Sequence, residues 1–196
     1  MDMNKIKLFE EFNYERASID ELRNNLVEHG IPVDSWGTGQ SKTLNHLFKE
    51  IENRECFLSD EGEYLTRYIE FVAIKVYYRK NDELYFLAED RQEFNDGRVR
   101  RRKMPSSVSE KMKSGEDPLI SAIRGIEEEL GFRVESSQLS KRKDIVYNGS
   151  SISYPGLTAK YKGHQFTCYI NDEQFDERGY IEVQKDKKTF FKWVKS

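Results

Sequence analysis

The first part of the chain places hydrophobic residues at helical spacing between polar ones. Ser18-Ile-Asp-Glu21 has the form of a capping box, in which the two end side chains satisfy free amides at the start of a helix. Leu22 and Leu26 lie one turn apart, and Gly30 is suited to end the helix. The pattern therefore predicts a first helix from about Ser18 to Gly30.

A second helix is predicted to begin near Thr43, because hydrophobic residues recur on one face after it, at Leu44, Leu47 and Ile51. Together the two helices would form a helical extension over residues 18–65. The preceding residues 1–17 are polar with scattered aromatic side chains and are predicted to form a flexible arm. The main domain is expected to cover residues 66–196.

Beyond residue 66 the pattern changes to that of strands. Residues 68–78 are β-branched and aromatic, and residues 84–88 follow after Asn81-Asp82, which predicts a hairpin. A helix is predicted over about 117–130. Further strands are predicted at 143–147, 157–161, 165–170, 179–183 and 189–194. Strands, an internal helix and then more strands indicate an α/β or α+β sandwich.

The predicted internal helix has one hydrophobic stripe. At about 100° per residue, one face of the helix carries Leu119, Ile123, Ile126 and Leu130, and this face should pack on the sheet. Arg124 and Glu128 lie opposite this stripe, while Gly125 and Glu129 lie on its flank. Gly131 suits a left-handed cap at the end of the helix.

The stretch from Gly115 to Phe132 resembles the signature of the Nudix hydrolase family, G-x5-E-x7-R-E-U-x-E-E-x-G-U, where U is a bulky apolar residue. Glu116 stands at the first glutamate, and Arg124 follows after the required spacing. The remainder is met by Ile126, Glu128, Glu129, Gly131 and Phe132. So many matches at fixed spacing, with strands before and after the helix, make a fairly specific signal.

The resemblance implies a Nudix-like α/β/α sandwich with a mixed sheet over residues 66–196, and the family often dimerises. It also implies a pyrophosphohydrolase that uses Mg²⁺ or Mn²⁺ and acts on a nucleoside diphosphate linked to another group. By this resemblance Glu128 and Glu129 are catalytic metal ligands. Arg124 would orient these carboxylates by a salt bridge, and Glu116 would be a peripheral or water-mediated ligand.

Two positions depart from the signature. Glu110 stands where the signature begins with glycine, and Gly125 stands where it has the glutamate after the arginine. In the family that glutamate is usually a direct metal ligand, and Glu127 cannot replace it because it projects about 160° away around the helix. Glycine inside a helix costs roughly 1 kcal/mol relative to alanine. Local propensity therefore does not explain Gly125, whereas close approach by another group would.

Two hypotheses follow from these departures. In the first, Glu110 substitutes for the missing carboxylate as a metal ligand, and the domain is a hydrolase. In the second, the domain is a catalytically impaired module that binds a nucleotide or a protein partner. Nudix enzymes also often take a further acid from a downstream loop. The sequence does not select among the candidates Asp172, Glu173, Glu177 and Glu182.

Residues 98–103 form a basic run, Arg-Val-Arg-Arg-Arg-Lys, that leads toward the segment 106–113 before the helix. The run would either grip phosphates or an acidic partner, or form a charged strand edge that prevents aggregation. Arg102 from the run and Lys111 from the following segment are candidate substrate contacts. Binding of RNA through residues 98–103 is a third, less favoured hypothesis.

Composition limits the partners and the compartment. The chain is 37% hydrophobic and 34% charged, which indicates a globular protein. Its formal net charge of −3 gives it no general attraction for nucleic acid or acidic membranes. The nucleotide-type small molecule expected as partner is what the Nudix resemblance implies. No run approaches the roughly 20 apolar residues that span a bilayer. A soluble, cytoplasmic protein with two free cysteines is expected.

Overall fold

The computed structural model describes residues 18–60 and 64–196, which fall into two compact units. The first unit contains the described residues of Met1–Glu70 together with Met112–Gly115 and Val146–Lys162. The second contains Phe71–Lys111, Glu116–Ile145 and Gly163–Ser196. The predicted flexible arm, residues 1–17, lies outside the described residues. None of the described helices has the length and apolar character that crossing a membrane requires.

Both N-terminal helices of the first unit form where the sequence predicts them. Helix α1 (Ile19–Glu28) begins at Ser18, whose hydroxyl accepts from the Glu21 amide while the Glu21 side chain accepts from the Ser18 amide. Helix α2 (Leu44–Glu52) begins at Thr43, which is paired with His46 in the same reciprocal way. The short 3₁₀ helix η2 (Val33–Ser35) lies between them in the sequence. The predicted capping box is confirmed.

The first unit also holds a strand that the sequence pattern does not predict. Strand β1 (Phe57–Asp60) pairs antiparallel with the beginning of β2 (Leu65–Lys80). Leu58 from β1 is buried together with hydrophobic side chains of α1 and α2. A strand of only four residues gives too few alternating positions to be recognised from sequence.

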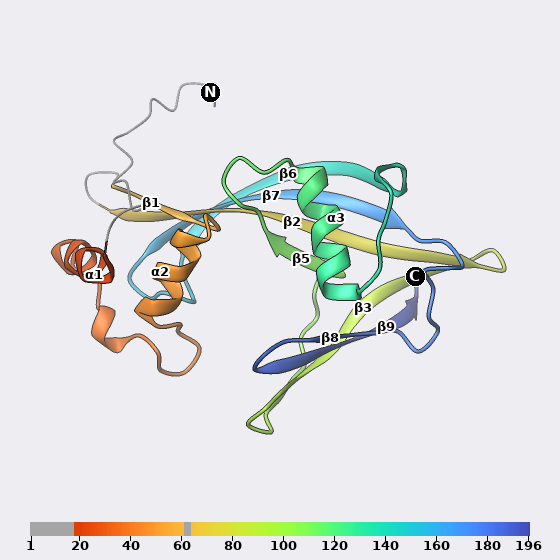
Figure 1. The fold of residues 1–196 in the computed structure, drawn as a ribbon, viewed down its shortest axis with the longest axis horizontal. Coiled ribbons are helices and arrows are strands. Elements are labelled where there is room, and N and C mark those ends of the chain that lie inside the picture. Colours follow the sequence, from red (N-terminus) through yellow and green to blue (C-terminus); the bar gives the residue numbers. More distant parts are fainter. Residues whose placement is uncertain (1–17, 61–63) are drawn as a thin grey trace. The chain divides into compact units, whose positions relative to one another are not determined.

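The second unit is built on a mixed sheet. Its strands are hydrogen-bonded in the order β6-β7-β2-β3-β9-β8, while β4 pairs with β3 and β5 pairs with β2. Strand β7 runs beside β2 in the same direction, and β6 runs in the opposite direction (Figure 1). The bounds are β3 (Glu83–Phe94), β4 (Val99–Arg100), β5 (Val108–Lys111), β6 (Leu139–Ser150), β7 (Thr158–Tyr169), β8 (Tyr180–Val183) and β9 (Lys187–Lys195), with the 3₁₀ helix η3 (Ser136–Gln138) before β6. The mixed α/β architecture is the one that the sequence predicts.

Two strands predicted at 157–161 and 165–170 are one continuous strand, β7. Gly163 lies between the two predicted ranges and leaves room for packing. A Cβ atom at Gly163 would lie 2.5 Å from the ring of Phe71 and 2.8 Å from Cγ1 of Ile145. The missing side chain therefore leaves room for neighbouring strands, as glycine inside a strand often does.

Helix α3 (Pro118–Leu130) lies against the sheet of the second unit (Figure 1). Asp117 caps its start, because the Asp117 carboxylate accepts from the amides of Leu119 at 2.8 Å and Ile120 at 3.2 Å. Gly131 ends it in the left-handed region with φ of 77°. Both ends of the predicted helix are confirmed.

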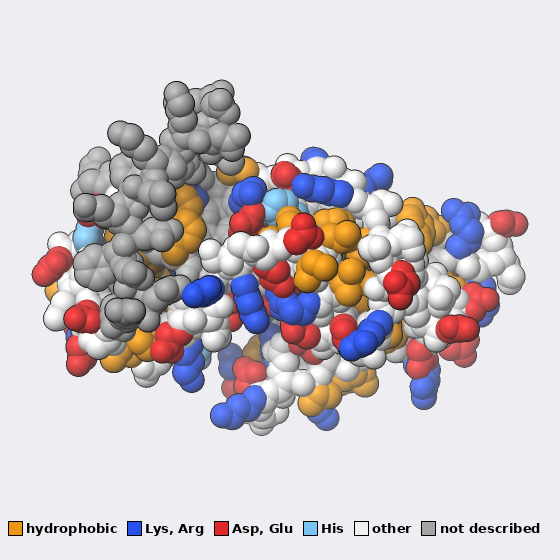
Figure 2. Space-filling view, turned by 45° about the horizontal axis from the view of Figure 1, so that its top comes forward, with side chains coloured by type: hydrophobic (Ala, Val, Ile, Leu, Met, Phe, Trp, Pro, Cys, Tyr) orange, Lys and Arg blue, Asp and Glu red, His pale blue; other side chains and the backbone are white. Residues whose placement is uncertain are grey.

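The buried face of α3 differs from the predicted stripe. The buried residues are Ser121, Ala122, Gly125, Ile126 and Leu130. Leu119 and Ile123 stay partly exposed, and hydrophobic side chains are visible at the surface over α3 among acidic and basic ones (Figure 2). Because Ala122 has a small side chain and Gly125 has none, the helix backbone can approach the sheet. The helix is therefore turned so that Gly125, which was predicted on the flank, is buried.

Ile126→Ala should lower the free energy of unfolding by about 2–5 kcal/mol, because Ile126 is fully buried and its removal leaves a cavity. Ile120→Ala on the same helix is the matched control, since Ile120 is 58% exposed, and it should change stability by about 0.5 kcal/mol or less. Urea unfolding of the full chain measures both. Equal losses in the two variants would contradict this placement of the buried face.

Candidate active site

The candidate site is built where α3 packs on β5. Strand β5 pairs with β2 so that Glu110 lies opposite Val72 and Val108 lies opposite Ile74. A Cβ atom at Gly125 would lie only 2.9 Å from the Cβ of Glu110 and 3.4 Å from Cγ1 of Val108. Real Cβ atoms essentially never approach so closely. Gly125 is therefore glycine because the Glu110 side chain occupies the space beside it.

The two departures from the signature are thus neighbours in space. A glutamate replaces glycine at position 110, and a glycine replaces glutamate at position 125. The Glu110 Cβ lies 2.9 Å from the ideal Cβ position of residue 125. A glutamate side chain at either position would therefore begin in the same small region between β5 and α3. The pair is a reciprocal exchange of glycine and glutamate between β5 and α3.

Arg124 donates hydrogen bonds to three of the four glutamates that the sequence analysis names as candidate metal ligands. Its Nε and Nη2 donate to both carboxylate oxygens of Glu116, at 2.9 Å and 3.0 Å. Its Nη1 donates to Glu110 and to Glu128, each at 3.1 Å. The hydrogen bonds that Arg124 donates to Glu116, and then the one it donates to Glu110, raise the pKa of its guanidinium against the opposing effect of burial. Bidentate and charge-assisted contacts of this kind fix the geometry of the group.

Glu129 is in a different environment from the other three glutamates. It is partly buried on the sheet side of α3, and the backbone amide of Ser109 on β5 donates to its carboxylate. Burial and then repulsion by Glu182, Glu110 and Glu89 raise the pKa of Glu129 to about 9, against the smaller opposing effect of the Ser109 amide. Several carboxylates therefore act on one another around Glu129, without Arg124 as a direct partner.

Glu182 on β8 is the downstream acid that acts on Glu129, among the four candidates from the sequence. Asp172 instead accepts a hydrogen bond of 3.0 Å from the hydroxyl of Tyr78, and Glu173 and Glu177 are exposed. Glu89 on β3 was missed by sequence analysis. Its position depends on how β3, β9 and β8 pair, and no local signal marks it.

The basic run at residues 98–103 is largely neutralised. Arg102 binds Glu89 through Nε at 2.9 Å and Nη2 at 2.8 Å, and Arg101 pairs with Asp90 at 3.2 Å. Arg98 pairs with Asp96 at 2.7 Å. The other candidate substrate contact, Lys111, ends β5, and its carbonyl accepts from Arg124 Nη2 at 3.0 Å. Within the described residues, the structure therefore places Arg102 against an acid of the Glu129 environment.

The arrangement of donor side chains decides whether this site can hold a metal ion. In the part of the chain that the structure describes, no three His, Cys, Asp or Glu side chains are arranged so that they could together hold a metal ion. Glu110, Glu116 and Glu128 instead each pair with Arg124. The chemistry of the set still suits a hard cation, since carboxylate oxygens are the ligands that Mg²⁺ and Mn²⁺ prefer.

Gly125→Ala should destabilise the protein, although alanine gains about 1 kcal/mol over glycine in a helix. The added Cβ meets Glu110 Cβ, and overpacking of this kind costs about 1–3 kcal/mol. In a Glu110→Gly background the same change should become stabilising. Denaturant unfolding of the four proteins gives the coupling between the two positions, expected at about 1–3 kcal/mol. Additive effects would show that the two residues do not compete for one space.

Stability should fall as pH rises, through Glu129. The folded carboxyl keeps its proton up to a pKa of about 9, whereas the unfolded one releases it near the ordinary value of 4.5. The folded state therefore binds the extra proton between these values, and its stabilising effect is lost as pH rises through that window, with a slope of at most ~1.4 kcal/mol per pH unit. Unfolding in chelator at pH 5 to 8 should show this slope in the wild type. Glu129→Gln should lose it, and Glu127→Gln, which removes a carboxylate paired with Arg133, should keep it.

No protein-family model and no curated protein sequence matches this chain. Among solved structures, it is similar to an Ap4A hydrolase from C. elegans, with 14% identity, a TM-score of 0.37, and coverage of 65% of this chain and 80% of that one. It is similar to the dihydroneopterin triphosphate pyrophosphohydrolase of E. coli, with 17% identity, a TM-score of 0.41, and coverage of 64% and 79%. A MutT/nudix family protein from Enterococcus faecalis gives 14% identity, a TM-score of 0.43, and coverage of 91% and 56%. The solved structures to which the chain is similar include these Nudix-type proteins, at low identity.

Proposed function

We propose that the second unit is a metal-dependent hydrolase that cleaves a phosphoanhydride bond in a nucleoside diphosphate linked to another group. The observation that supports this proposal is the exchange between positions 110 and 125. A chain that had merely lost a ligand would leave the space beside Gly125 empty or fill it with an apolar side chain. Here a glutamate fills it, with its Cβ 2.9 Å from the place of the missing one.

The proposed ligands for Mg²⁺ or Mn²⁺ are Glu129, Glu110 and Glu182. After the effect of burial, repulsion by Glu182 and Glu110 raises the pKa of Glu129, and a divalent cation would relieve this repulsion. Arg124 donates one hydrogen bond to Glu110 and two to Glu116, so it holds Glu110 through fewer hydrogen bonds than Glu116. When bound, the metal supplies charge neutralisation for the phosphates and a more acidic water.

The chain's own residues supply position and exclusion of water. Arg124 pairs with Glu116 and Glu128, and in this proposal the two glutamates act as positioning residues, while the metal-ligand role implied by the resemblance stays a prediction. The amide of Ser109 orients Glu129 from β5. Because Glu129 is partly buried between helix and sheet, charges that meet there interact in a low dielectric and are stronger than in water.

A catalytically impaired binding module is the second candidate function. The observation in its favour is that Arg124 already holds Glu110, Glu116 and Glu128, so that the described residues present no ready group of three metal-binding side chains. In this alternative Arg124 replaces the metal as the structural cation. The two candidates differ in whether any substrate is turned over.

Hydrolysis should be measured on dinucleoside polyphosphates, sugar nucleotides and nucleoside triphosphates with Mg²⁺ or Mn²⁺. Glu129→Gln and Glu110→Gln should each lower kcat/KM by roughly 100-fold or more, because each removes a charge that stabilises the transition state. Glu110→Gly should be equally inactive. The exchange variant Glu110→Gly/Gly125→Glu should recover activity to within roughly tenfold of wild type. In this variant α3, in place of β5, supplies the carboxylate to the same region.

Glu127→Gln is the control, because it removes a carboxylate of the same helix that pairs with Arg133 and faces away from Glu129. It should leave kcat/KM unchanged, and thermal unfolding of each variant separates loss of activity from loss of fold. The absence of turnover on every substrate, together with a thermal shift on adding a nucleotide, would replace the hydrolase by the binding module. Full activity of Glu110→Gln would remove Glu110 from the site.

A further inference from the structure

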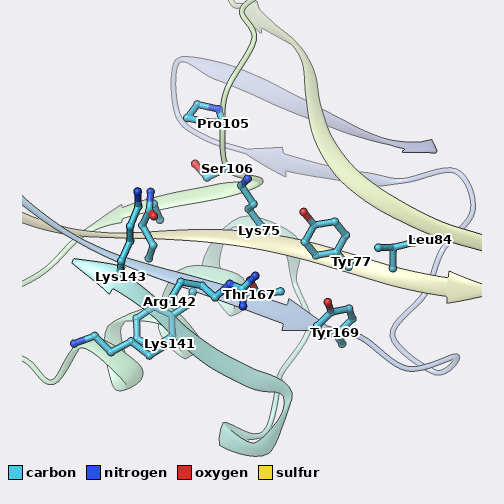
Figure 3. A pocket seen from close by; sticks show the side chains of 13 residues that line it. Lys75, Tyr77, Leu84, Pro105, Ser106, Lys141, Arg142, Lys143, Thr167 and Tyr169 are labelled. Carbon is cyan, nitrogen blue, oxygen red and sulfur yellow. The ribbon is translucent and has the colours of Figure 1, made fainter. Parts of the chain in front are cut away.

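A second candidate site is a cavity on the sheet of the second unit. Its volume is about 620 Å³, within the roughly 300–1,000 Å³ that is usual for small-molecule sites. Strands β2, β6 and β7 provide most of its lining, and Pro105 and Ser106 complete one side. Figure 3 shows the basic side chains of β6 at one end, Tyr77, Leu84 and Tyr169 at the other, and Lys75 between them.

The cavity lies on the face of the sheet opposite α3. Val72, Ile74 and Val76 of β2 are fully buried, and Glu110 and Val108, their partners on β5, are the side chains beside Gly125 of α3. Successive side chains of a strand point to opposite faces. The cavity is lined by the alternate residues Ala73, Lys75 and Tyr77. It is therefore separate from the carboxylates around Glu129.

The charge of the cavity is positive and mostly uncompensated. Its basic residues are Lys75, Lys141, Arg142 and Lys143, and no acidic residue lines it. Lys141 pairs with Asp144 at 3.2 Å. Within the described residues, Lys75, Arg142 and Lys143 have no acidic partner. This contrasts with the run 98–103, where most arginines are paired with acids. An anion in the cavity would meet charges that no protein carboxylate screens.

Two hydroxyl-bearing residues and an aromatic end extend the set of contacts. Ser106 and Thr167 are 6% and 5% exposed and both line the cavity, so they add polar side chains to the groups that a ligand there would contact. At the other end Tyr77 and Tyr169 stack with centroids 5.7 Å apart, and Tyr169 keeps 49% of its surface exposed.

We propose that this cavity binds a nucleoside carrying two or more phosphates. The phosphates would lie against Lys75, Arg142 and Lys143, where charge-assisted hydrogen bonds form, and the base would lie against the exposed ring of Tyr169. Ser106 and Thr167 offer hydroxyls between these ends. The proposal does not rest on hydrolysis, because the cavity and the carboxylates occupy opposite faces of the sheet.

The binding of ADP to the full chain should be measured by calorimetric titration in EDTA, with pyrophosphate, adenosine and a ten-nucleotide single-stranded RNA as comparison ligands. Lys75→Gln/Lys143→Gln should weaken ADP binding at least tenfold, and Tyr169→Ala should weaken ADP but not pyrophosphate. The charge-matched control is Lys185→Gln/Lys188→Gln, which removes two exposed lysines that do not line the cavity and should leave ADP affinity unchanged. The altered side chains are at the surface, and thermal unfolding checks that each variant folds.

Equal loss of ADP binding in both lysine double variants would overturn the proposal, since net charge alone would then explain it. Pyrophosphate binding as tight as ADP binding, with no effect of Tyr169→Ala, would remove the base from the site and overturn the nucleoside part. RNA binding more than tenfold tighter than ADP, with a steep dependence on salt, would show a nucleic-acid surface in place of a nucleotide site. Failure of ADP to bind at millimolar concentration would end the proposal.

Discussion

The contact of Glu110 with Gly125 sets the distance between α3 and β5, and the rest of the candidate active site depends on that distance. A side chain at 125 would need the space that Glu110 fills, with the two Cβ positions 2.9 Å apart. Close approach brings Glu129 within reach of the Ser109 amide and brings Arg124 within reach of the carboxylate and carbonyl on β5. A single missing Cβ thus determines which charged groups of helix and sheet meet.

Electrostatic balance divides the second unit into compensated and uncompensated regions. Arg124 satisfies three carboxylates, and the arginines of the run 98–103 are mostly paired with acids of β3 and its turn. Two places remain unbalanced. Around Glu129 several carboxylates repel one another, and in the cavity on the opposite face three cations lack an acidic partner among the described residues. Uncompensated charge in a concave or partly buried place is the usual mark of a binding site.

The two faces of one sheet therefore carry opposite charge for a structural reason. Alternation along β2 sends Val72, Ile74 and Val76 toward α3, where β5 adds its glutamate, and sends Lys75 and Tyr77 to the other face. The β6 segment Lys141-Arg-Lys143 then adds its cations to that second face. A net charge of −3 for the whole chain conceals this separation. Local charge, and not the total, decides where an anionic ligand is attracted.

The sequence alone determined the elements whose signals are local. The capping residues Ser18, Thr43 and Asp117 and the left-handed Gly131 fix where helices begin and end, because a cap needs only neighbouring residues. The resemblance also implied a salt bridge from Arg124, and the one to Glu128 forms because helical geometry brings residues four apart to one side. What Gly125 is for was left open between two hypotheses. Only the tertiary structure decided that Glu110 fills its space, that Glu182 and Glu89 act on Glu129, and that Arg142 and Lys143 lack an acidic partner among the described residues while most arginines of the run 98–103 are paired. Each of these depends on strand pairing and side-chain packing between distant segments, which local spacing does not encode.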